Sequence, residues 1–131
     1  MKATILYIED NPLNMRLVRK LVKSFGYQMI EAMDGITGLE MVKLKHPDLL
    51  LVDVNLPGMD GLEIVSIMKQ TPELADIPTI ALTANAMHGD RERCLNAGCD
   101  AYIAKPIARQ ELYNAINRYL SVDDDKRTVA S

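Results

Sequence analysis

The sequence is short of several features, and each shortage excludes something. Trp is absent, Cys occurs twice, and no apolar run exceeds four residues, the length of residues 49–52. A bilayer span takes about 20 apolar residues, and Glu9 and Asp10 interrupt the amino-terminal apolar stretch, so we expect neither a membrane span nor a signal peptide. Cys94 and Cys99 lack the CxxC spacing of a redox pair. We therefore expect free thiols and a cytoplasmic protein.

The sequence also lacks an excess of positive charge. There are 15 Lys+Arg against 18 Asp+Glu, a formal net charge of −3. A general nucleic-acid-binding surface is basic, so we expect no nucleic acid among the partners. The 131 residues suffice for one domain with its own core. We expect that domain to occupy residues 1–120, with a short polar, frayed tail at 121–131.

Strand-like and helix-like segments alternate five times along the chain. Short apolar runs predict strands, and helical spacing predicts helices between and after them. The expected strands are residues 4–8, 28–32, 49–52, 79–82 and 101–104. Five strands alternating with five helices predict an α/β fold, an open parallel sheet with helices on both faces. The eight strands of a closed barrel are lacking.

Local signals predict where individual helices begin and which faces they bury. Asn11 followed by Pro12 marks a helix start, and Asp60 with Glu63 has the spacing of a capping box. A more polar helix is expected from about residue 86 to residue 97, closed by Gly98. The apolar positions expected in the first two helices are Leu13, Leu17, Val18, Leu21, Val22 and Phe25, then Leu39, Val42 and Leu44.

Polar residues stand where four of the strands end. Ligands of open α/β sheets bind outside these carboxyl ends, and there the chain carries Glu9, Asp10, Asp53, Thr83 and Lys105. Clustered carboxylates repel one another and raise each other's pKa unless a cation joins them. Mg²⁺, or Mn²⁺, prefers such oxygen ligands together with phosphate oxygens. With a lysine and a hydroxyl beside them, the acids have the composition of a phosphoryl-transfer site.

The segments around these residues resemble a known family. Residues 8–11 (IEDN), 52–61 (VDVNLPGMDG), 82–84 (LTA) and 102–106 (YIAKP) are similar in order and spacing to the receiver domains of two-component response regulators. The resemblance covers about residues 3–120. It implies a flavodoxin-like, doubly wound five-stranded parallel sheet of strand order 2-1-3-4-5 with five helices.

The resemblance also implies a role for each site residue. Asp53 would accept a phosphoryl group from a sensor histidine kinase or a histidine phosphotransfer protein. Asp10 would bind Mg²⁺ directly, Glu9 through water, and Asn55 through its backbone carbonyl. Lys105 would hold a phosphoryl oxygen. Taken singly, each residue also has a structural interpretation, since acids at these positions can cap turns and a lysine can be a surface charge.

A second group of residues would respond to the phosphoryl group. By resemblance, Thr83 would swing inward with help from the Ala84 N–H, and Tyr102 would change rotamer. The alternative for Tyr102 is a half-buried edge aromatic. Pro106 would follow a cis peptide bond. The resemblance also implies that Asn55 and Asn85 occupy the two positions that set the phosphoryl lifetime in this family. Candidate partner-facing residues on the face of the fourth helix, last strand and last helix are His88, Arg91, Arg109, Gln110 and Tyr113.

We therefore expect a stand-alone phosphoacceptor that is not an enzyme toward other substrates, and that contacts a downstream protein as a monomer or a phosphorylation-dependent dimer. One alternative is a receiver excised from a larger regulator or hybrid histidine kinase. A Mg²⁺-dependent phosphatase with an Asp nucleophile would carry a second acid at the position of Asn55. A flavin carrier would have a Ser/Thr/Gly-rich phosphate loop after the first strand, where Glu9 and Asp10 stand instead. A constitutive interaction module would have no need of the acids and Lys105 together.

Overall fold

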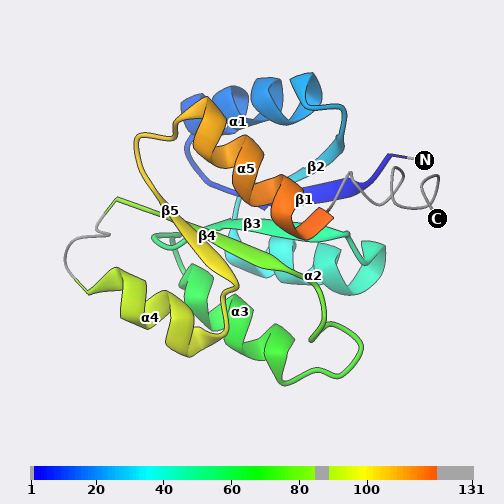
Figure 1. The fold of residues 1–131 in the computed structure, drawn as a ribbon. Helices are drawn as coiled ribbons and strands as arrows, with labels where there is room; N and C mark the ends of the chain where they lie inside the picture. Colours follow the sequence, from blue (N-terminus) through cyan, green and yellow to red (C-terminus); the bar gives the residue numbers. More distant parts are fainter. Residues whose placement is uncertain (1, 85–88, 121–131) are drawn as a thin grey trace.

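Five parallel strands form a sheet in the order β2-β1-β3-β4-β5, which confirms the expected topology. The computed structural model describes residues 2–84 and 89–120. The strands are β1 (Thr4–Ile8), β2 (Gln28–Ala32), β3 (Leu49–Asp53), β4 (Thr79–Thr83) and β5 (Ala101–Ala104). The helices are α1 (Pro12–Ser24), α2 (Gly35–Lys45), α3 (Gly61–Lys69), α4 (Asp90–Ala97) and α5 (Arg109–Leu120) (Figure 1).

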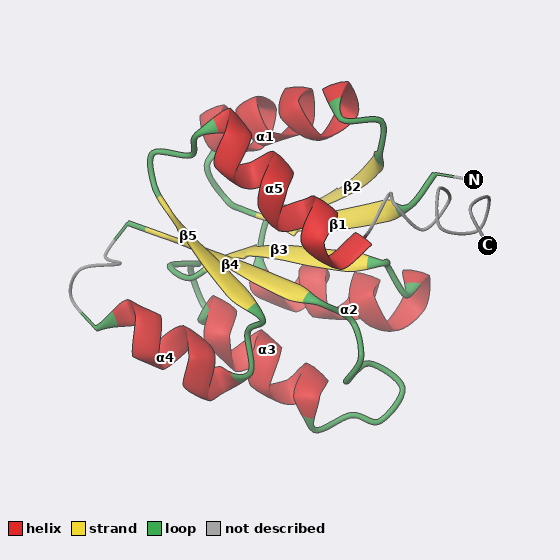
Figure 2. Cartoon of the chain, in the orientation of Figure 1, coloured by secondary structure: helices red, strands yellow, loops and turns green. Residues whose placement is uncertain are grey.

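Helices cover the sheet on both sides. In Figure 2, α1 and α5 lie over one face, while α2, α3 and α4 lie under the other. Alternate residues of β1 divide between these layers: Ile5 and Tyr7 pack in the α1–α5 core, and Leu6 and Ile8 pack in the opposite core. All four are fully buried. This two-sided covering explains why the strands read as continuous apolar runs.

Side-chain caps start the helices that border the carboxyl edge of the sheet. The Asn11 side chain accepts hydrogen bonds from the first turn of α1, and Pro12 follows it, as expected. Asp60 and Glu63 form the expected capping box at the start of α3. Each cap closes the loop that runs from the end of a strand, β1 or β3, to the following helix.

The apolar face expected for the first helix is partly wrong. Leu13 is 72% exposed and Leu17 is 42% exposed. The buried positions of α1 are Met15, Val18 and Val22. These three are spaced three and four residues apart and form the stripe that faces the sheet, whereas Leu13 and Leu17 lie outside it.

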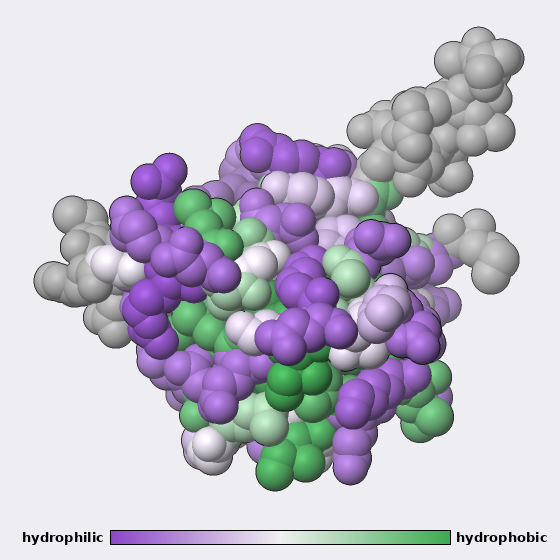
Figure 3. Space-filling model, turned by 90° about the horizontal axis from the view of Figure 1, so that it is seen from below, coloured by the Kyte–Doolittle hydropathy of each residue, from purple (hydrophilic) through white to green (hydrophobic). Residues whose placement is uncertain are grey.

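Leu44, expected as an apolar position of the second helix, is 77% exposed. Ile36 of α2 and Leu95 of α4 are also exposed. Figure 3 views the molecule from below and shows hydrophobic patches separated by hydrophilic side chains. None of the helices in the described ranges is long and apolar enough to cross a membrane.

Several expectations fall on residues outside the described ranges. These include the first residues of the predicted fourth helix, Asn85 and His88, and the tail at 121–131. The described part of that helix begins at Asp90, after Gly89 in the left-handed conformation, and it ends at Gly98 as expected.

Candidate functional site

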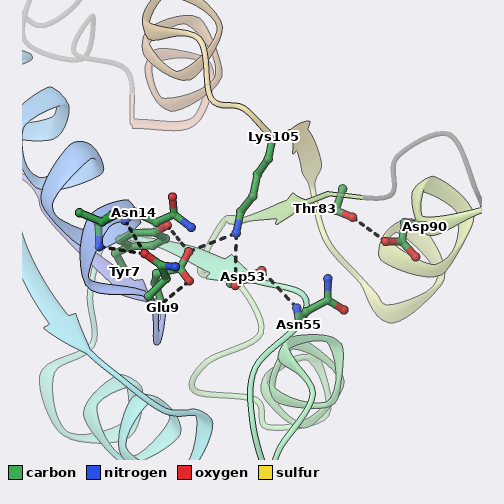
Figure 4. A network of polar contacts seen from close by, with 10 residues as sticks. Tyr7, Glu9, Asn14, Asp53, Asn55, Thr83, Asp90 and Lys105 are labelled. Carbon is green, nitrogen blue, oxygen red and sulfur yellow. Dashed lines mark hydrogen bonds and ion pairs between the residues drawn. The ribbon is translucent and has the colours of Figure 1, made fainter.

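The parallel sheet brings four strand ends to one edge. Glu9 and Asp10 follow β1, Asp53 ends β3, Thr83 ends β4, and Lys105 follows β5. Because all strands run in the same direction, their carboxyl ends meet at this edge. Figure 4 shows Lys105 extending toward Glu9 and Asp53, with Thr83 to one side. The strand-end arrangement predicted from sequence is therefore present.

Lys105 joins two buried carboxylates. Its Nζ lies 3.3 Å from Glu9 Oε1 and 3.3 Å from Asp53 Oδ2 (Figure 4). Glu9 is 1% exposed and Asp53 is 4% exposed, whereas Asp10 is exposed. Oxygens of these three acids lie within 4.8 Å of one another. The ammonium group of Lys105, which follows β5, thus faces a cluster of acids from the ends of β1 and β3.

Burial and mutual repulsion separate the pKa values of the two buried acids. Burial raises the pKa of Asp53, its bond and charge interaction with Glu9 raise it further, and the result is about 6. Burial also opposes ionisation of Glu9, but hydrogen bonds with Tyr7 and Asp53 lower its pKa. The Asn11 N–H and the charge of Lys105 act in the same direction, so the pKa of Glu9 lies below its ordinary value. Glu9 therefore carries the more stable charge, and Asp53 is held in an unfavourable setting as an anion.

The donor set fits a hard divalent cation. It consists of carboxylate oxygens, one of them on an exposed side chain that solvent and a ligand can reach. Mg²⁺ takes oxygen ligands in octahedral geometry and retains several waters, so it needs such an open side. An open pocket of about 460 Å³ supplies it, and its lining includes Asp10, Asn55 and Gly58. A cation here would also relieve the repulsion that raises the pKa of Asp53.

Backbone groups position Asp53 within this edge. The Asn55 N–H donates to Asp53 Oδ1 at 3.1 Å, while the Asn55 side chain is exposed. The start of α3 presses against the same strand end, because a Cβ on Gly61 would overlap the carbonyl oxygen of Asp53. Gly61 thus permits a close approach between helix and strand.

Thr83 faces away from the acid cluster. Its side chain is fully buried, and Oγ1 donates to Asp90 Oδ2 at 2.5 Å. Figure 4 shows this hydroxyl pointing toward α4 while Asp53 lies on the other side. Ala84 is exposed beside it, and Tyr102 is half-buried in β5. The structure therefore gathers the acids and Lys105, and it leaves the Thr83 hydroxyl bonded elsewhere.

The Lys105–Pro106 peptide bond is cis, as expected. It stands directly after β5, and the Lys105 N–H donates to the Thr83 carbonyl at 2.8 Å. The backbone at the base of the Lys105 side chain is thus tied to the end of the neighbouring strand.

Two polar residues at this edge escaped the sequence analysis. Tyr7 is fully buried, and its hydroxyl donates to Glu9 Oε1 at 2.7 Å. Burial raises the pKa of Tyr7, so the hydroxyl stays a donor. The signal was its position two residues before Glu9, since alternate residues of a strand share a face. Asp90 gave a weaker signal, the acid that follows Gly89 at a helix start.

Comparisons with known proteins agree with this geometry. The family model of the response regulator receiver domain matches residues 5–117. The polar-differentiation response regulator DivK of Brucella ovis is 43% identical over 120 residues, which cover 92% of this chain and 98% of that protein.

Solved structures show the same fold. The receiver domain of a sensor histidine kinase from Pseudomonas aeruginosa is 37% identical, with a TM-score of 0.85 over 91% of this chain and 98% of that one, and it holds a magnesium ion in its active-site cleft. The receiver domain of a signal transduction histidine kinase from Syntrophus aciditrophicus is 33% identical, with a TM-score of 0.85 and 92% of each chain covered. The strand-end site, the family match and these relatives together show that this chain belongs to the response regulator receiver family of two-component signalling.

Proposed function

We propose that Asp53 accepts a phosphoryl group from a phosphohistidine on a sensor histidine kinase or a histidine phosphotransfer protein. The observation that carries this proposal is the placement of Asp53, a carboxylate 4% exposed, next to a second buried acid and a lysine at the ligand-binding edge of the sheet. A buried acid that Asn55 and Lys105 orient is poised to act as a nucleophile.

The chain supplies the groups that this transfer needs. An oxygen of Asp53 attacks phosphorus, the bond from phosphorus to the histidine nitrogen breaks, and its electron pair stays on that nitrogen. Lys105, already 3.3 Å from Asp53, holds a phosphoryl oxygen and balances its charge. We assign Asp10, Asp53, the Asn55 carbonyl and, through water, Glu9 as the residues that would hold Mg²⁺ or Mn²⁺. When bound, that ion neutralises charge on the phosphoryl oxygens.

In this proposal, phosphorylation of Asp53 changes the conformation of the end of β4. The acyl phosphate adds negative charge and acceptor oxygens at Asp53. Thr83 turns toward a phosphoryl oxygen, assisted by the Ala84 N–H, and Tyr102 takes up the space that Thr83 leaves. The α4–β5–α5 face then repacks and changes its affinity for a downstream protein or a second copy of the chain.

Receiver domains of two-component systems interact with kinases and downstream targets, and we propose that this one works without an attached output domain. Support comes from the Brucella regulator, of which the alignment covers 98%. In this proposal residues 1–120 form the receiver, and the protein catalyses only its own phosphorylation and dephosphorylation. We place it in the cytoplasm.

Incubation with acetyl phosphate and Mg²⁺, read by intact mass, tests the proposal. We expect one added phosphoryl group on the wild type, and none on Asp53→Asn or without the metal. The matched control is Asp100→Asn, which removes a carboxylate charge at the opposite edge of the sheet and should leave incorporation unchanged. Unmodified wild type would overturn the proposal, and many turnovers on a phosphoester would indicate a phosphatase instead.

A further inference from the structure

We propose that Asp90 competes with the phosphoryl group for the hydroxyl of Thr83, and so sets how readily the site takes up a phosphoryl group. This inference rests on the proposed function and adds a residue that the proposed transfer does not use. Asp90 is the first residue of α4, so it belongs to the element next to the switch and not to the acid cluster.

The Thr83–Asp90 contact is buried on both sides. Asp90 is 4% exposed, and Thr83 is fully buried. Among the described residues the buried acids are Glu9, Asp53 and Asp90, and Asp90 is the one whose contacts lie outside the Lys105 cluster. A hydroxyl that donates to a buried carboxylate at 2.5 Å forms a short, charge-assisted bond, which is stronger than a neutral one.

A second contact fixes the direction in which the Asp90 carboxylate points. Its other oxygen, Oδ1, accepts from Arg93 Nη1 at 2.7 Å, and Arg93 Nη2 lies 3.3 Å from Asp60 Oδ2. Asp60 caps the helix that follows the Asp53 loop. A polar chain therefore runs from Thr83 through Asp90 and Arg93 to Asp60, and it ties the end of β4 to the start of α3.

The two uses of the Thr83 hydroxyl exclude each other. A hydroxyl carries one proton and donates one strong hydrogen bond. In this structure that proton is directed to Asp90 on α4, whereas Asp53 lies on the opposite side of Thr83 (Figure 4). Thr83 cannot donate to a phosphoryl oxygen on Asp53 until it has left Asp90. Asp90 thus stabilises the conformation without the phosphoryl group.

The size of this effect follows from the type of bond. A hydrogen bond to a charged group is stronger than a neutral one, and its loss removes the stabilisation of the conformation without the phosphoryl group. We therefore expect Asp90→Ala to tighten the binding of a phosphoryl analogue at Asp53 about tenfold. Asp90→Asn keeps an acceptor for the hydroxyl but removes the charge, so it should tighten binding less, by about threefold.

Beryllofluoride provides the probe, because it binds an aspartate carboxylate in the manner of a phosphoryl group. Its apparent affinity with Mg²⁺ is measured by NMR titration for the wild type, Asp90→Ala, Asp90→Asn and Arg93→Gln. We expect Arg93→Gln to tighten binding less than Asp90→Ala, since it only loosens the orientation of Asp90. In a Thr83→Val background, Asp90→Ala should have no further effect on affinity, because no hydroxyl remains to be released.

The control is Asp100→Asn, which changes a carboxylate that accepts from Thr79 N–H at the other end of β4. Thermal unfolding shows which variants are folded. If Asp90→Ala is not folded, the comparison with the wild type uses Asp90→Asn and Arg93→Gln instead. Equal affinities of folded Asp90 variants and wild type would overturn the competition alone. The competition would also be overturned if Asp100→Asn bound beryllofluoride as tightly as Asp90→Ala does, or if Asp90→Ala tightened binding by the same factor in the Thr83→Val background. Absence of binding to the wild type would instead overturn the proposed function, and the competition with it.

Discussion

The two edges of the sheet use aspartate in opposite ways. At the amino edge, Asp48 accepts from the Thr4 N–H at 2.7 Å and returns its own N–H to the Thr4 carbonyl at 2.8 Å. Asp100 and Thr79 repeat this reciprocal pair, with both contacts at 2.8 Å. Both of these acids thus accept a hydrogen bond from the first amide of a neighbouring strand.

At the carboxyl edge, acids are placed against acids. Glu9 and Asp53 are buried side by side and share a single lysine, and the pKa of Asp53 rises to about 6, first through burial and then through Glu9. The same residue type thus stabilises the sheet at one edge and is held at a cost at the other. Such local conflict is expected where a site must bind a cation and a phosphoryl group.

Replacement of Lys105 should have the largest effect on the function of the carboxyl edge. Lys105→Met deletes the charge that faces both Glu9 and Asp53, so the rate of phosphoryl incorporation should fall about a hundredfold or more, as when one donor to a transition-state anion is lost. The measurement is the time course of phosphorylation by acetyl phosphate. Its control is Lys69→Met, since Lys69 lies 3.8 Å from Asp100 at the amino edge. Slow phosphorylation of Lys69→Met together with a normal rate for Lys105→Met would contradict the role assigned to Lys105.

Because ionised Asp53 destabilises the folded protein, the free energy of unfolding in metal-free buffer should depend on pH. The folded-state pKa, about 6, lies above the ordinary value of 3.8, so the native state binds the proton more tightly than the unfolded state. The wild type should therefore lose stability relative to Asp53→Asn as pH rises from about 4 to about 6, by on the order of 2 kcal/mol.

Urea unfolding of both proteins across this pH range, with and without Mg²⁺, measures the difference. Saturating Mg²⁺ should reduce or reverse it, because a cation that binds the native state stabilises the wild type. Asp100→Asn should lose stability at every pH. A wild type that stays as stable as Asp53→Asn at pH 7 without metal would refute the conflict inferred at this edge.

The smallest effect should come from the amino edge. Asp48→Ala removes the acceptor of the Thr4 N–H and should lower the free energy of unfolding by about 1 kcal/mol, read as a shift of the urea midpoint at constant slope. Phosphoryl incorporation should be unchanged. If incorporation fell as far as in Lys105→Met, the two edges would not be functionally separate.

The sequence predicted most of the fold because its strands are buried on both faces. Continuous apolar runs and the caps at Asn11 and Asp60 indicated the order of elements, and the direction of parallel strands then brought Glu9, Asp53 and Lys105 to one edge. The exposed leucines of α1 were misjudged because two adjacent stripes of that helix are apolar, and only contact with the sheet selects between them.

The contacts that orient the site residues could not be predicted in the same way. Tyr7 stands inside an apolar run, and its bond to Glu9 depends on which core its ring enters. The bond from Thr83 to Asp90 joins a strand end to a helix start, and nothing in residue spacing specifies the rotamer that forms it. Such contacts depend on side-chain directions that arise only when the helices pack on the sheet.

Localisation of the phosphoryl group tests the central claim most directly. Borohydride reduces an acyl phosphate to an alcohol, so treatment after phosphorylation by acetyl phosphate and Mg²⁺, followed by peptide mass spectrometry, identifies the modified acid. We predict reduction at Asp53 alone. Reduction at Asp48 or Asp100 of the amino edge, or at no residue, would contradict the account.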